Sequence, residues 1–141
     1  MFRAMDALGD RWTLMVLREA FMGVRRFTDM QSDLGVARNV LTDRLNFLVD
    51  HGILERRQYQ DRPPRFEYRL TEKGLDLYPV LVAIMKWGDR WKSDDKPPVR
   101  LVHKLCDHDA DPKLVCGHCG QELAAREVRA EPGPGLSPVA A

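Results

Sequence analysis

The cysteines and histidines near the C-terminal end are the residues of this 141-residue chain best suited to chemistry. His103 and Cys106 are separated by two residues, and after a nine-residue spacer Cys116 and Cys119 repeat that spacing. Two such pairs resemble a small zinc ribbon, because zinc prefers four tetrahedral nitrogen and sulfur ligands and a two-residue loop lets two ligands hold one ion. We therefore predict a structural Zn ion bound by these four side chains, with no open position for a water.

Two alternatives remain open from the sequence of this segment. His108 is the second choice for the fourth ligand, whereas His118 lies inside the Cys116–Cys119 loop and is expected to point away. A disulfide between Cys116 and Cys119, acting as a thiol redox switch, is the alternative to metal binding. Because residues 101–125 offer almost no apolar core, we expect that a metal is needed to fold them.

No other residues indicate catalysis, since the chain has neither a glycine-rich phosphate loop nor a convincing Ser, His and Asp order, and we predict that it is not an enzyme. Three cysteines favour reduced or metal-bound thiols in the cytoplasm over a secreted disulfide scaffold. The longest apolar run, residues 80–85, is too short to cross a membrane, and no membrane partner is expected.

Charge is distributed unevenly along the chain. The formal net charge of +1 excludes an overtly basic nucleic-acid binder. However, residues 25–73 hold ten basic and eight acidic residues and carry +2, whereas residues 101–125 hold two and four and carry −2. The middle of the chain is therefore mildly basic, and its charge is cancelled by the C-terminal segment.

Three helices are predicted within residues 1–51. The first lies within residues 1–24 and ends near Gly23; the second starts with a capping box of Thr28 and Gln31 and ends at Gly35. The third spans residues 37–51 and ends at Gly52. Apolar residues at helical spacing mark the first helix (Leu8, Trp12, Met15, Val16) and the third (Leu41, Leu45, Leu48, Val49).

A strand pair and a long helix follow. Residues 53–59 and 66–70 form the strands, and the tip between them contains Pro63 and Pro64 and should project. Thr71 caps a helix to about Lys92, in which Pro79 causes a kink or marks a junction of two helices.

This order predicts a mainly α fold with a small β-hairpin wing, a winged helix-turn-helix. We expect residues 1–93 to form a DNA-binding and dimerisation domain, 94–100 a linker, 101–125 the zinc ribbon and 126–141 a flexible tail.

The polar face of the third predicted helix is suited to a DNA major groove. Asn39 can pair with adenine and Arg38 with guanine through bidentate hydrogen bonds. The alternative is a solvated face, on a helical domain that recruits a protein partner without sequence-specific DNA binding. The predicted DNA-binding residues are Arg25, Arg26, Arg38, Asn39, Thr42, Arg44, Arg62 and Arg65.

Several motifs in order over residues 4–92 resemble the HxlR-type transcriptional regulators, which are related to the MarR group. The motifs are Gly9-Asp-Arg-Trp-Thr-Leu with Leu17-Arg-Glu, Arg25-Arg-Phe-Thr-Asp, Leu41-Thr-Asp-Arg-Leu, Gly52-Ile-Leu-Glu-Arg, and Tyr68-Arg-Leu-Thr-Glu-Lys-Gly. Many members carry a cysteine just before the first helix and some sense oxidants through it. This chain has none there, so that thiol switch is not implied.

The resemblance implies a cytoplasmic, bacterial-type regulator that binds double-stranded DNA as a homodimer on a pseudo-palindromic operator, and we expect a repressor. Some members carry a similar Cys-rich extension. The sequence identifies neither a small-molecule effector nor the operator. In the family the first helix and the long helix build the dimer, which here assigns the interface to Leu8, Trp12, Val82, Met85, Trp87 and Trp91. The alternative is that the tryptophans pack within one subunit.

Overall fold

The computed structural model describes residues 2–92 and 97–134, and the chain divides into two compact units, residues 1–97 and 98–141. Residues 94–96 of the predicted linker and residues 135–141 of the predicted tail lie outside the described residues. Among the residues described, no helix is both long and apolar enough to cross a membrane.

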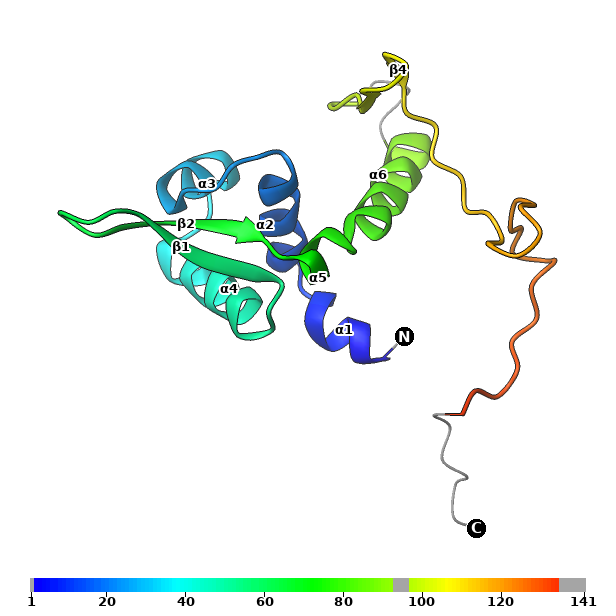
Figure 1. Cartoon of the computed structure of the whole chain (residues 1–141), viewed down its shortest axis with the longest axis horizontal. Helices are drawn as coiled ribbons and strands as arrows, with labels where there is room; N and C mark the ends of the chain where they lie inside the picture. Colours follow the sequence, from blue (N-terminus) through cyan, green and yellow to red (C-terminus); the bar gives the residue numbers. More distant parts are fainter. Residues whose placement is uncertain (1, 93–96, 135–141) are drawn as a thin grey trace, which may run out of the picture. The chain divides into compact units, whose positions relative to one another are not determined.

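The first unit has the predicted order of three-helix body, hairpin and C-terminal helix, with the hairpin extending from one end (Figure 1). This confirms the mainly α winged helix-turn-helix. Its elements are α1 (Phe2–Leu8), α2 (Arg11–Phe21), α3 (Phe27–Leu34), α4 (Arg38–Asp50), β1 (Leu54–Gln60), β2 (Arg65–Leu70), α5 (Glu72–Leu75) and α6 (Tyr78–Lys92).

The prediction of a single first helix is wrong, because the chain breaks between α1 and α2. The Gly9 N–H closes α1 by donating to the Met5 carbonyl at 2.7 Å, and a Cβ at Gly9 would lie 2.5 Å from that oxygen. The Asp10 side chain then caps α2 by accepting from the Thr13 N–H at 2.9 Å. Apolar periodicity continues across this break and therefore conceals it.

The predicted capping box of the second helix is also wrong. Thr28 lies inside α3, where its hydroxyl donates to the Asp29 carboxylate at 3.1 Å, and Arg26 precedes the helix without a side-chain cap. The reason lies far away in sequence: Arg26 forms a β-bridge with Glu67 of the wing, which fixes where α3 begins. The predicted stop at Gly35 is confirmed, with φ of 59°.

A single apolar cluster holds the helices and the base of the hairpin together. Leu41, Leu45 and Leu48 of α4 are fully buried against Val16 and Leu17 of α2. The predicted stripe of α4 therefore faces the core, and its polar face must point outward. The other buried apolar members are Met30, Val36, Ile53 and Leu54.

The strands pair antiparallel, with Leu54 opposite Leu70 and Gln58 opposite Phe66. The predicted cap at Thr71 is confirmed, since its hydroxyl accepts from the Gly74 N–H at 3.1 Å. The junction alternative at Pro79 is also confirmed: α5 ends at Leu75, and Pro79 lies in the first turn of α6, where proline is tolerated.

The second unit consists of two small turns. β3 (Val102–His103) and β4 (His108–Asp109) pair antiparallel around the first, and a bridge between Val115 and Glu122 flanks the second. No described residue of this unit is buried.

Candidate nucleic-acid interface and cysteine–histidine turns

The N-terminal half of α4 presents polar side chains to solvent. Arg38, Asn39 and Thr42 are exposed, whereas Leu41 on the opposite face is buried. The Thr42 hydroxyl donates to the Arg38 carbonyl at 2.9 Å, and the Arg38 guanidinium lies 5.1 Å from the ring centre of Phe27. Within the part of the chain that the structure describes, the Asn39 amide has no protein hydrogen-bond partner. Asn39 is therefore available for an external ligand.

Arg44 differs from its neighbours on α4 because it contacts another helix. Its guanidinium lies 3.6 Å from the Asp10 carboxylate at the N-cap of α2, and it is only half-exposed. Desolvation opposes ionisation of Asp10, but the hydrogen bonds from Thr13 and the charge of Arg44 outweigh it and lower the pKa of that carboxyl. Arg44 thus ties α4 to α2 through a charged carboxylate.

Arg25 and Arg26 lie where the helices meet the wing. The Tyr68 N–H donates to the Arg25 carbonyl at 2.8 Å, so the backbone ahead of α3 extends the edge of the wing sheet. Both side chains are exposed, and the Arg26 guanidinium lies 4.9 Å from the ring centre of Tyr59. Two cations are therefore held on the outer surface beside the start of α3.

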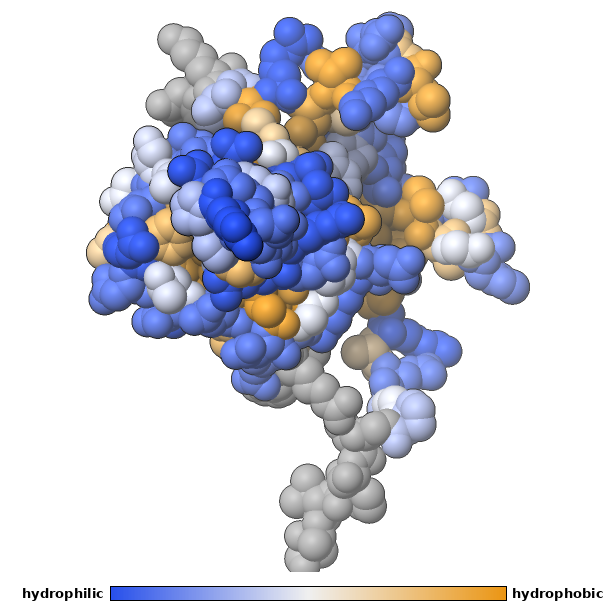
Figure 2. Space-filling view, turned by 60° about the vertical axis from the view of Figure 1, so that its left-hand side comes forward, coloured by the Kyte–Doolittle hydropathy of each residue, from blue (hydrophilic) through white to orange (hydrophobic). Residues whose placement is uncertain are grey.

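The tip of the wing is polar and internally hydrogen-bonded. The Gln58 amide donates to the Gln60 carbonyl and to the Asp61 carboxylate, both at 3.1 Å, and the Gln60 amide donates to the Arg62 carbonyl at 3.1 Å. Arg62 and Arg65 project exposed side chains from either side of the two prolines. Figure 2 views this end turned forward, and hydrophilic side chains cover most of the surface there.

Two further arginines of the wing were missed by the sequence analysis. Arg56 and Arg57 of β1 are exposed, and Arg56 lies 3.7 Å from the ring centre of Phe66 on the partner strand. A run of polar residues in a strand signals only a solvent-exposed edge, so the sequence did not distinguish them from ordinary surface charge.

The predicted dimer residues divide into two groups. Leu8 and Trp12 are half-buried and pack against the subunit's own core, and Val82 is buried. Met85 is half-buried. In contrast, Trp87 and Trp91 are 59% and 61% exposed. They continue an apolar stripe along α6 at helical spacing, which consists of Val80, Ile84, Trp87 and Trp91.

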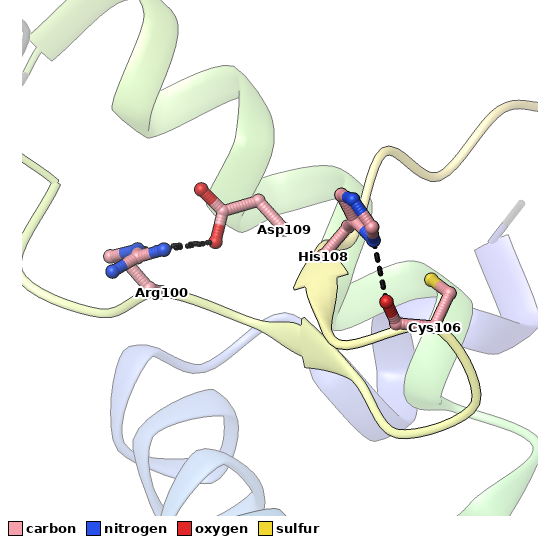
Figure 3. Close-up of polar contacts among 4 residues, drawn as sticks. All are labelled: Arg100, Cys106, His108 and Asp109. Carbon is pink, nitrogen blue, oxygen red and sulfur yellow. Dashed lines mark hydrogen bonds and ion pairs between the residues drawn. The ribbon is translucent and has the colours of Figure 1, made fainter.

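The first turn of the second unit brings His103 and Cys106 together. The Cys106 sulfur lies 3.4 Å from Nδ1 of His103, and the N–H groups of Cys106 and Asp107 donate to the His103 carbonyl at 3.1 and 2.8 Å. His108 takes a different position, in which its Nδ1 lies 2.5 Å from the Cys106 carbonyl oxygen (Figure 3). Arg100, just before β3, pairs with Asp109 of β4 at 2.8 Å.

The second turn surrounds the Cys116 sulfur with donors. Backbone hydrogen bonds from Cys119 and His118, together with the Cys119 thiol, lower the pKa of the Cys116 thiol. The Gly120 N–H donates to the Cys116 carbonyl at 2.7 Å. Within the described ranges, no group of three or more His, Cys, Asp or Glu side chains lies close enough together to hold a metal ion. The structure therefore forms each predicted ligand pair but does not bring all four ligands together.

A helix-turn-helix with an exposed polar helix and an arginine-bearing wing defines the class of winged-helix DNA-binding proteins. The sequence matches the HxlR-like helix-turn-helix family over residues 7–96. The chain belongs to this family, as its motifs indicated. It is accordingly a DNA-binding transcriptional regulator and not an enzyme.

Relatives match both units of the chain. An uncharacterised HTH-type transcriptional regulator of Mycobacterium tuberculosis H37Rv is 49% identical over 135 residues, which is 95% of this chain and 85% of the relative. The crystal structure of PA1607, described as a candidate transcription factor, is similar with a TM-score of 0.81 and 37% identity over 92% of this chain and 91% of that one. PA1374 from Pseudomonas aeruginosa, also described as a candidate transcription factor, has a TM-score of 0.68 and 33% identity over 96% and 92%.

Proposed function

We propose that the protein is a cytoplasmic homodimer that binds a pseudo-palindromic operator and represses transcription from it. The observation that carries the proposal is the outward polar face at the start of α4, where Asn39 has an unengaged amide. Such an amide can accept from and donate to one adenine edge, which is a sequence-specific contact. Repression follows if the bound dimer excludes the polymerase from the promoter.

The arginines divide into two proposed roles. Arg38 lies beside Asn39 and contacts bases, while the exposed cations at the start of α3 and at the wing tip contact phosphates or the minor groove. We assign Arg44 to the Asp10 contact and Thr42 to the helix itself, because both side chains already have protein partners. Arg56 and Arg57 extend the phosphate-binding surface along the wing.

The homodimer is supported by the apolar stripe of α6. Two exposed tryptophans on one helix face are costly in water and are typical of an interface. A twofold-symmetric pairing through this stripe would present two copies of α4, as a pseudo-palindromic operator requires.

The DNA contacts are tested by measuring affinity for an operator fragment and for random DNA over a range of salt concentrations. We expect Asn39→Ala to lower operator affinity by about 1–3 kcal/mol per half-site and to leave random DNA unchanged. Arg62→Ala should weaken both DNAs alike and reduce the salt slope by about one per subunit. Asn46→Ala makes the same change two turns further along α4 and should have little effect. Equal loss on both DNAs for Asn39→Ala would refute its role.

The alternative of a protein-recruiting module gives a different result in the same titration. Wild-type protein without sequence preference at low salt would overturn operator recognition. A reporter placed behind the operator tests repression, because deletion of the regulator should raise its expression. Unchanged or lower expression would contradict a repressor.

The dimer is tested by sedimentation of Trp87→Ala and Trp91→Ala at fixed concentration. We expect the wild type to be dimeric and these variants to shift toward monomer, because truncation of a central interface tryptophan often costs 2 kcal/mol or more (about 30-fold in dissociation constant). Leu105→Ala removes a comparably exposed apolar side chain from the second unit and should remain dimeric. A monomeric wild type would contradict the proposal.

A further inference from the structure

The two turns of the second unit are built alike. In each turn, the carbonyl of the first residue of the pair accepts a hydrogen bond from the N–H four positions later. The Asp107 N–H donates to the His103 carbonyl at 2.8 Å, and the Gly120 N–H donates to the Cys116 carbonyl at 2.7 Å. In each, the residue after the second member of the pair has positive φ, 56° for Asp107 and 75° for Gly120. Antiparallel pairing flanks both turns. Repetition of one backbone geometry around one ligand spacing indicates one shared purpose.

Asp107 makes the repetition informative, because a residue other than glycine is uncommon in the left-handed region. Asp107 is the only such residue in the described part of the chain. The conformation directs the chain back after Cys106, as Gly120 does after Cys119, and leaves the paired side chains on the same turn. The first turn therefore adopts this geometry although Asp107 lacks the conformational freedom of glycine at a positive φ.

The distance within the first pair matches shared coordination of one ion. Zinc binds nitrogen at about 2.0–2.1 Å and sulfur at about 2.3 Å, so two tetrahedral ligands lie about 3.5 Å apart. Nδ1 of His103 and the sulfur of Cys106 are separated by 3.4 Å. In the second turn, the Gly120 N–H donates to the Cys116 carbonyl at 2.7 Å, so Cys116 and Cys119 lie on one tight turn, as His103 and Cys106 do.

Cohesion of the second unit requires a cross-link that apolar packing does not supply. No described residue between Pro97 and Pro134 is buried, and Leu105 is 89% exposed. The rest of the unit is held by two short pairings and by exposed ion pairs such as Arg100–Asp109, which contribute little. Small domains of this kind use a metal ion in place of a core.

We propose that His103, Cys106, Cys116 and Cys119 together bind one zinc ion, which joins the two turns into a single folded unit. The set is Cys₃His, tetrahedral and closed, and its role is structural. His103 is assigned as the fourth ligand because its Nδ1 lies 3.4 Å from the Cys106 sulfur, whereas Nδ1 of His108 faces the Cys106 carbonyl and His118 lies within the second loop. We expect DNA binding by the first unit to be independent of this site.

The test uses the full chain, purified under reducing conditions and loaded with zinc, then dialysed and analysed for bound metal. We expect about one zinc per chain, and none for Cys116→Ser or His103→Ala. The matched controls His108→Ala and His118→Ala should keep about one. Loading with Co²⁺ should give the visible absorption of tetrahedral sulfur coordination in the wild type and in both controls. All three tryptophans lie in the first unit, so an unchanged fluorescence melting curve shows that a variant has folded there.

Four results would overturn the proposal. Wild-type protein with less than one zinc per several chains would exclude the site. Half an ion per chain would show that two chains share the ligands. Retention of zinc by His103→Ala with loss by His108→Ala would reassign the fourth ligand. Recovery of a Cys116–Cys119 disulfide from zinc-loaded wild type would favour the redox alternative.

Discussion

The two units of this chain are stabilised in opposite ways. The first has a cluster of nine buried apolar residues, drawn from α2, α3, α4 and the base of the wing. The second has no buried residue among those described, yet it holds all three cysteines and three of the four histidines. One unit therefore folds around apolar side chains, whereas the other is proposed to be held by polar side chains that share an ion.

In the first unit, the residues proposed to bind DNA are different from those that stabilise the fold, whereas in the second unit the proposed metal ligands would do both. Asn39 and Arg62 lie on outer surfaces, opposite to or far from the buried stripe of α4, so either can be changed without opening the core. In the second unit the proposed ligands are themselves the cross-link. Substitution of Cys116 is therefore expected to abolish zinc binding and to unfold the second unit at the same time.

Removal of zinc should have the largest effect and tests most directly whether the two units are stabilised differently. Chelation from zinc-loaded protein should raise amide hydrogen exchange across residues 98–134 to nearly unfolded rates, because the metal supplies most of the folding free energy of such a unit, about 10–16 kcal/mol in zinc-finger peptides. Exchange in α2 and α4 should stay unchanged. The measurement is hydrogen exchange followed by mass spectrometry. Protection in residues 98–134 that survives chelation would mean that the second unit has a source of stability other than metal.

The reciprocal perturbation is a cavity in the first unit. Leu45 is fully buried in α4, and Leu45→Ala should lower the free energy of unfolding by about 2–5 kcal/mol. Urea unfolding followed by tryptophan fluorescence at fixed protein concentration measures it, and the Co²⁺ spectrum of the second unit should be unaltered. Leu105→Ala is the control and should change stability by less than about 0.5 kcal/mol. A similar loss for both variants would show that burial does not distinguish the units.

Local signals in the sequence predicted much of the first unit. Gly35 and Gly52 end their helices with positive φ, and Thr71 caps the next one, because each of these effects depends on a residue and its near neighbours. Alternation of apolar residues predicted the paired strands for the same reason. The outward face of α4 followed from its buried stripe.

What the sequence did not predict depends on contacts between distant segments. The start of α3 is fixed by the bridge from Arg26 to Glu67, and the position of Arg44 by Asp10 on another helix. Neither partner is identifiable from spacing along one element. Likewise, the spacing along the chain predicted the His103–Cys106 and Cys116–Cys119 pairs, whereas the proposed assembly of all four ligands depends on how the two turns meet.

The smallest effect concerns the charged contact that joins α2 to α4. Asp10→Ala should lower the free energy of unfolding by about 1 kcal/mol near pH 7, because it removes the cap of α2 and the partner of Arg44. The pKa of Asp10 is lower in the folded protein than its ordinary value of 3.8, so ionisation stabilises the fold. This contribution is fully present above about pH 4 to 5 and is lost as the pH falls through the lowered folded pKa.

Urea unfolding of wild type and Asp10→Ala at pH 7, 5 and 3 would measure this dependence. The difference between the two proteins should be similar at pH 7 and 5 and smaller at pH 3. Asp33→Ala, which alters an exposed acid on α3, should differ from wild type by less than about 0.5 kcal/mol at pH 7. A difference for Asp10→Ala that stays constant to pH 3 would mean that the capping hydrogen bonds act without the charge. The contact between α2 and α4 would then rely on packing and neutral hydrogen bonds, which would sharpen its contrast with the metal site proposed for the second unit.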